Sequence, residues 1–148
     1  MPRTLSPQSE LEFEELTAFL RFYLVEIKGN SAALLQQSAT EIIEKFGRSK
    51  ALAGLRQATN DTIEELTGAS DEAVALIDQA LAERGLVSFT ELRRRYSAHY
   101  KRLLKRGSIR DETEFHLVSG IVSDASAKMP GEERVQLQRM IDAYERDA

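Results

Sequence analysis

The 148-residue sequence contains no cysteine. This absence excludes disulfides, zinc–thiolate sites, iron–sulfur clusters and thiol catalysis, and it fits a reducing compartment. Long apolar runs are also missing. The longest, residues 18–27, is interrupted by Arg21 and Glu26, and a membrane-spanning helix needs about 20 apolar residues. The first residues lack the apolar core of a secretion signal, so we expect a cytoplasmic protein without a membrane partner.

Signals for β-structure are scarce. The chain has only three prolines, two of them within the first seven residues, and no alternating β-branched runs. Between glycines that mark helix ends, the apolar residues recur at helical spacing. The sequence therefore predicts an all-α protein, a single compact bundle of six to seven helices in one domain (8–146) after a disordered or extended segment (1–7). The helices are expected near residues 8–28, 31–46, 49–67, 71–84, 89–106, 112–123 and 131–146.

The first predicted helix, 8–28, is apolar around most of its circumference. Phe13, Leu16 and Tyr23 lie on one stripe, and Phe19 and Phe22 extend the apolar surface beyond it. A helix of this kind is buried on all sides, so we expect it to run through the middle of a bundle. The alternative is a homodimer interface through residues 13–27. Helix 31–46 has a single apolar face, formed by Leu35, Ala39, Ile42 and Phe46.

Positive charge is concentrated in residues 91–110. The stretch holds eight of the twenty Lys and Arg residues and a single acid, Glu91, and it carries +7 against −4 for the whole chain. If residues 89–106 form one helix, it is about 27 Å long. Its apolar side then contains Phe89, Leu92, Tyr96, Tyr100 and Leu103. The opposite side presents Arg94, Arg95, Lys101, Arg102, Lys105 and Arg106.

A cationic helix face of this kind predicts a partner of opposite charge. We expect a non-enzymatic interaction module (an adaptor, inhibitor, immunity factor or regulator) that uses the face around residues 93–106 to bind an acidic protein surface. One alternative is a regulator that binds nucleic acid through the same cations. Another is a face that is only solvated, or that is paired with acids of the fold. The acids available for such pairing are Glu10, Glu12, Glu14, Glu15, Asp111, Glu112 and Glu114.

The nucleic-acid alternative would not use a standard helix-turn-helix. With Gly85 as the glycine of the turn, Leu81 occupies the position that is normally small. Glu91 and Arg94 then fall where the second helix of that motif is buried. The segment is better explained as an ordinary helical hairpin.

Motifs for chemistry are absent. The sequence has no GxxxxGK, GxGxxG or GxSxG string. His116 follows Glu112 by four residues, which supplies at most half of a metal site. We therefore predict no catalytic residues, no metal and no cofactor. An enzyme with an unrecognised site is the third alternative, and it would require a pocket that joins His99 or His116 to carboxylates.

Overall fold

The computed structural model describes residues 5–124 and 129–147, which form eight α-helices, one π-helical turn and no strands. The all-α prediction is confirmed. Residues 1–4 of the predicted segment 1–7 lie outside the described residues, and the domain limits stay a prediction. The elements are α1 (Pro7–Phe22), η1 (Tyr23–Ile27), α2 (Ala32–Phe46), α3 (Arg48–Glu65), α4 (Asp71–Glu83), α5 (Phe89–Tyr96), α6 (Ala98–Arg106), α7 (Glu112–Ser123) and α8 (Gly131–Asp147).

Short polar side chains begin most of these helices. The Ser88 hydroxyl accepts the Glu91 N–H at 2.9 Å, and the Asp111 carboxylate accepts the Glu114 N–H at 2.9 Å. Each bond satisfies a backbone donor that has no partner within its own helix. At the other end of α6, Gly107 adopts a left-handed φ of 78°, which a residue with a side chain rarely adopts.

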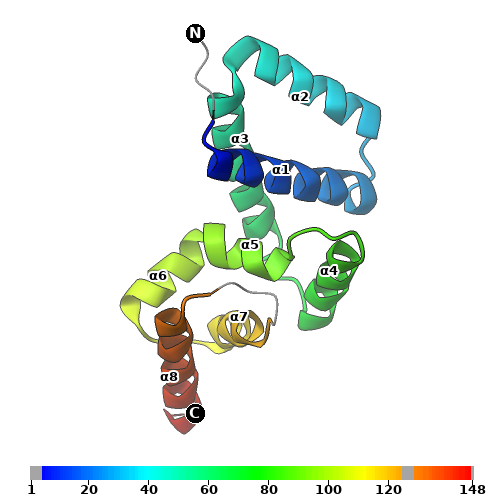
Figure 1. Ribbon diagram of the computed structural model, residues 1–148. Helices are drawn as coiled ribbons and strands as arrows, with labels where there is room; N and C mark the ends of the chain where they lie inside the picture. Colours follow the sequence, from blue (N-terminus) through cyan, green and yellow to red (C-terminus); the bar gives the residue numbers. More distant parts are fainter. Residues whose placement is uncertain (1–4, 125–128, 148) are drawn as a thin grey trace.

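The buried side chains form two clusters. One lies among α1, α3, α4 and α5, and the other among α6, α7 and α8. Helix α5 stands between them, because it packs against α3 and α4 on one side and against α7 on the other (Figure 1). The prediction that the first helix runs through the middle was therefore wrong. α1 packs mainly against α3, and α5 is the central helix.

Helix α1 nevertheless buries the apolar side chains that prompted that prediction. Phe13, Leu16, Phe19, Phe22 and Tyr23 are all buried within this chain. The structure thus favours the core alternative for residues 13–27 and gives no support to a homodimer through them. The last turn widens into the π-helix η1, where the Lys28 N–H donates to the Tyr23 carbonyl at 3.1 Å.

The predicted single helix 89–106 is two helices. Ser97 has φ −69° and ψ 118°, an extended conformation, and its hydroxyl accepts the Tyr100 N–H at 3.0 Å. This bond makes Ser97 the N-cap of α6 and ends α5 at Tyr96. The break divides the predicted apolar stripe between the two cores. Phe89 and Leu92 are buried in the first cluster, whereas Tyr100 and Leu103 are buried in the second.

Helix α2 lies at the edge of the molecule. It packs against α3, and none of its residues is buried (Figure 1). Its predicted face is only partly covered: Leu35 and Ala39 are half-buried, but Ile42 and Phe46 are exposed. The amphipathic pattern correctly predicted a helix here, yet the described part of the chain provides no second layer to cover it.

Candidate functional site

Two residues of the predicted cationic face, Arg94 and Arg95, form ion pairs inside the fold. Arg94 binds Glu91 of its own helix at 2.9 Å and Glu133 of α8 at 3.1 Å. Arg95 binds Glu15 of α1 at 3.2 Å. These two arginines therefore connect α5 to helices of both clusters, and their charges are neutralised by acids of the same chain.

Arg106 belongs to a second network, centred on Glu114. The Glu114 carboxylate is buried and is bound by Arg106, by the backbone N–H of Arg110 at 2.8 Å and by His99 Nε2 at 2.8 Å. Burial by itself raises the pKa of Glu114. The bonds from His99, the Arg110 backbone and Arg106 outweigh that effect and hold the pKa below its ordinary value. Glu114 thus remains charged and joins α6 to the start of α7.

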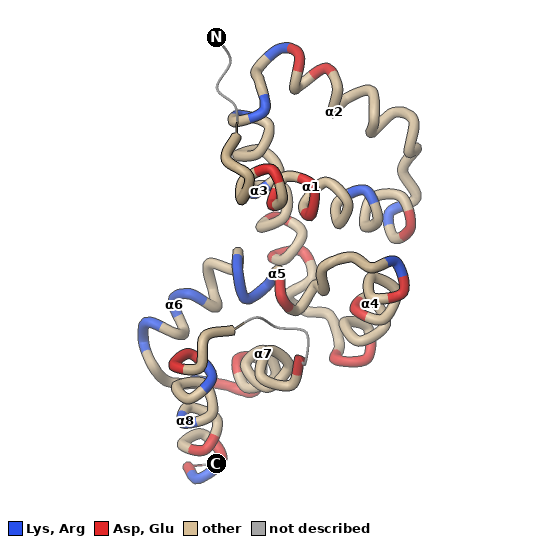
Figure 2. The backbone as a smooth tube through the Cα atoms, viewed as in Figure 1, with Lys and Arg blue, Asp and Glu red and all other residues tan. Residues whose placement is uncertain are grey.

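The other three cations of the predicted face point to solvent. Lys101, Arg102 and Lys105 are exposed on α6, and Arg110 is exposed in the loop that follows it. Within residues 5–124 and 129–147, none of these four side chains has an ion pair or hydrogen bond. Figure 2 shows the resulting run of cations along α6. We call these four residues the α6 cation cluster.

Part of this cluster borders a concavity of about 520 Å³ between α6 and the start of α7. Three arginines and one lysine line this concavity, and its one acid, Glu114, is already bound by Arg106. The wall therefore carries a net positive charge. The lining residues are His99, Arg102, Lys105, Arg106, Arg110 and Glu114. A wall of this composition attracts negatively charged groups.

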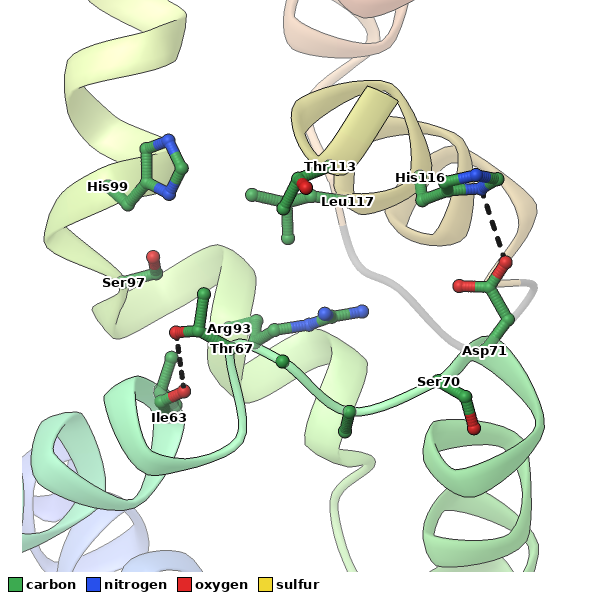
Figure 3. Close-up of a pocket in the computed structure, with 12 residues that line it drawn as sticks. Ile63, Thr67, Ser70, Asp71, Arg93, Ser97, His99, Thr113, His116 and Leu117 are labelled. Atoms are coloured by element: carbon green, nitrogen blue, oxygen red, sulfur yellow. Dashed lines mark hydrogen bonds and ion pairs between the residues drawn. The ribbon is translucent and has the colours of Figure 1, made fainter. Parts of the chain in front are cut away.

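A second cavity, of about 330 Å³, lies where the two core clusters meet (Figure 3). The loop between α3 and α4 forms one wall, α7 forms the opposite wall, and the junction of α5 and α6 closes the back. Ile63, Ser97 and Leu117 are buried at its base, whereas Ser70 and His116 are exposed at its mouth. We call this the junction cavity.

Arg93 projects into the junction cavity, between the α3–α4 loop and α7 (Figure 3). Burial lowers the pKa of its guanidinium, and the charges of Asp78 and Asp71 only partly offset that effect. Its guanidinium carbon lies 5.2 Å from the ring centroid of Phe89, a cation–π distance. The Nε atom is buried and has no hydrogen-bond partner among the described residues.

Both histidines line the junction cavity, as the enzyme alternative requires. Each is held by a carboxylate: His116 Nδ1 lies 3.2 Å from Asp71, and His99 lies 2.8 Å from Glu114. In the described part of the chain, neither imidazole is hydrogen-bonded to a serine or threonine hydroxyl, so no histidine–nucleophile pair is formed there. The described residues also contain no cluster of three acidic or histidine side chains that could hold a metal ion.

Comparison with known proteins gives no guide to function: no protein-family model matches the sequence, and no curated protein or solved structure matches the chain. Among the described helices, none has the length and apolar character needed to cross a bilayer. The function is therefore inferred from the geometry and charge of the two concave surfaces.

Sequence reasoning missed Arg93 and the junction cavity. Arg93 is followed directly by Arg94 and Arg95, and nothing in the run of three arginines distinguishes the one that points into the cavity. Helical spacing offers a signal in hindsight. Arg93 lies four residues after Phe89, on the apolar side of α5, where a charged side chain is unusual.

Proposed function

We propose that the protein is a non-enzymatic interaction module that binds an acidic protein surface through the α6 cation cluster. One observation carries the proposal: Lys101, Arg102, Lys105 and Arg110 are exposed, adjacent and without ion pairs in the described part of the chain. Buried or paired cations would have to give up existing bonds to meet a partner, whereas these four would not. Arg94, Arg95 and Arg106 would instead stabilise the packing of the helices that present the α6 cation cluster.

The size of the cluster limits the size of the contact. Helix α6 has nine residues, so it is about 13.5 Å long at 1.5 Å per residue. This is half of the stripe expected from a continuous helix 89–106. A matching partner would offer a short acidic helix or groove. Outside residues 91–110 the chain carries a net −11, since these residues carry +7 and the whole chain −4. An acidic partner is therefore repelled by other faces and oriented towards α6.

A charge-reversal triple, Lys101→Glu/Arg102→Glu/Lys105→Glu, tests the proposal. Its matched control is Lys45→Glu/Lys50→Glu/Arg146→Glu, which changes the net charge equally at exposed positions on α2, α3 and α8. We expect wild type and control to capture the same acidic proteins from host lysate, in a salt-sensitive manner, and the α6 triple to lose them. If the α6 triple retains every partner, the cluster is only a solvated surface.

Nucleic acid is the competing ligand, and its salt dependence separates it from a protein partner. Four phosphate contacts on duplex DNA give a log–log slope of binding against salt with a magnitude of about 3.6. We expect no retention of duplex DNA or RNA at physiological salt. If the protein binds nucleic acid with that slope, and the α6 triple loses this binding while the control keeps it, the ligand of the cluster is nucleic acid and not an acidic protein.

A further inference from the structure

Arg93 is a partly buried charged side chain that forms no direct ion pair with an acid of the described residues. No ion pair or hydrogen bond involves its side chain among the described residues, and its Nε is orphaned. The nearby charges of Asp71 and Asp78 act on it without a direct bond, since Asp71 binds His116 and Asp78 binds Thr90. The terminal N–H groups of the guanidinium also have no hydrogen-bond partner among the described residues, so they are available to an acceptor in the cavity.

The surroundings of Arg93 contain further donors. The Ser97 hydroxyl accepts the Tyr100 N–H, and the Ser70 hydroxyl accepts the Ala73 N–H at 3.1 Å. In each case the hydroxyl oxygen is engaged as an acceptor, which leaves its own proton free to be donated to a ligand. Both serines line the junction cavity together with Arg93. Figure 3 shows Ser97 on the α6 side of the cavity, whereas the Ser70 hydroxyl is turned toward the start of α4, away from the guanidinium.

The remaining walls of the cavity could accommodate the rest of a small molecule that carries such an acceptor. Ile63 and Leu117 give apolar contact at the base, and the volume of about 330 Å³ lies at the lower end of the range for small-molecule sites. Asp71 is the one carboxylate at the cavity, and it faces His116 at the mouth. An anion that enters past Asp71 therefore meets the Arg93 guanidinium and the Ser97 hydroxyl.

From this arrangement we infer that the junction cavity binds a small oxyanion, the carboxylate or phosphate group of a small molecule, with Arg93 as its anchor. The guanidinium presents N–H groups in a planar fork that matches two oxygens of either group. The Ser97 hydroxyl, which lines the same cavity, is a second donor for such a group. Since Ile63 belongs to the first core cluster and Leu117 to the second, a bound molecule joins the two halves of the fold.

This site is separate from the α6 cation cluster, and the two can be tested independently. The full chain is titrated with sodium phosphate, succinate and benzoate at constant ionic strength, with sodium chloride as the reference. Binding is followed by thermal unfolding and by calorimetry. We expect at least one of the three anions to raise the melting temperature saturably at millimolar concentration. Binding of phosphate, succinate or benzoate would indicate that the site takes a bare oxyanion, a polar carboxylate or an aromatic carboxylate, respectively.

Matched variants assign any binding to the cavity. Arg93→Met should weaken the affinity at least tenfold, whereas Arg102→Gln, which removes one positive charge from the α6 cation cluster, should leave it unchanged. Arg93→Met replaces a buried charge with an apolar side chain of similar length, so the apoprotein should unfold at the same or a higher temperature. If Arg93→Met does not fold, Arg93→Lys takes its place, because it keeps the charge but loses the fork.

A third variant blocks the cavity without altering its anchor. Thr113 is exposed at the mouth, near the start of α7, and Thr113→Trp should abolish binding while Arg93 remains. The inference is overturned if none of the three anions gives a saturable shift, or if the shift persists in Arg93→Met (or Arg93→Lys) and Thr113→Trp. Loss of binding in Arg102→Gln would also overturn it, since the anion would then bind α6.

Discussion

Reversal of charge at Arg94 should destabilise the fold rather than remove a docking contact. The Arg94 side chain is 15% exposed and contacts two carboxylates, Glu91 at 4% exposure and Glu133 at 17%. Tyr100 also donates its hydroxyl to Glu133 at 2.8 Å, which ties the same network to α6. In Arg94→Glu, a third carboxylate enters this buried site and both existing carboxylates lose a cation.

The magnitude follows from the burial of these partners. Removal of one member of a buried ion pair costs about 3–5 kcal/mol, because the other charge stays buried without compensation. Glu91 keeps a contact with Arg95 at 3.4 Å, which reduces the loss, and repulsion by the new carboxylate adds to it. We expect a net loss of about 4 kcal/mol, a large part of the 5–15 kcal/mol that stabilises a typical domain.

Urea unfolding followed by circular dichroism measures this loss directly. With a slope of about 2 kcal/mol per molar urea, the midpoint of Arg94→Glu should fall by about 2 M relative to wild type. The control is Lys101→Glu, which reverses an exposed charge on α6 and should change stability by about 0.5 kcal/mol or less. A loss below about 1 kcal/mol in Arg94→Glu would refute this reasoning, because it would show that the network contributes little to stability.

Two further perturbations test the elements that hold α6. The pKa of Glu114 is held below its ordinary value of 4.5, so its contribution to stability is complete above that pH and is lost as the pH falls through the lowered value. The urea midpoint should therefore drop on acidification below about pH 4.5, and less steeply in Glu114→Gln. Ser97→Ala removes the N-cap of α6 and should cost about 1 kcal/mol in the same assay, and an unchanged midpoint would show that the cap is dispensable.

The helices could be predicted well from the sequence because their ends carry local signals. Ser70, Ser88 and Asp111 each precede an apolar helical repeat and act as N-caps in the structure. Ser97 is also an N-cap, but no glycine or proline marks it. The apolar spacing continues across it, from Tyr96 to Tyr100, because each new helix happens to bury its own face at the same interval. Periodicity alone therefore could not reveal the break.

The charge count predicted a cationic region but not which cations face outward. Arg94 and Glu133 are 39 residues apart, and Arg95 and Glu15 are 80 apart. Internal pairing with the acids at positions 10–15 and 111–114 was one of the expected alternatives. The structure shows such pairs for Arg95 with Glu15 and for Arg106 with Glu114. Which alternative holds at each cation depends on tertiary contacts that spacing does not encode.

The break at Ser97 connects the two inferred surfaces. Because the chain changes direction there, the arginines of α5 lie against acids and the apolar core, while most cations of α6 face solvent. The same change of direction places Ser97 and Arg93 together in the lining of the junction cavity. A continuous helix 89–106 would keep Tyr100 and Leu103 in line with Phe89 and Leu92, and the two core clusters could not form as they do. The extended conformation of Ser97 therefore separates the ion-paired arginines of α5 from the exposed cations of α6. It also creates the cavity between the two core clusters.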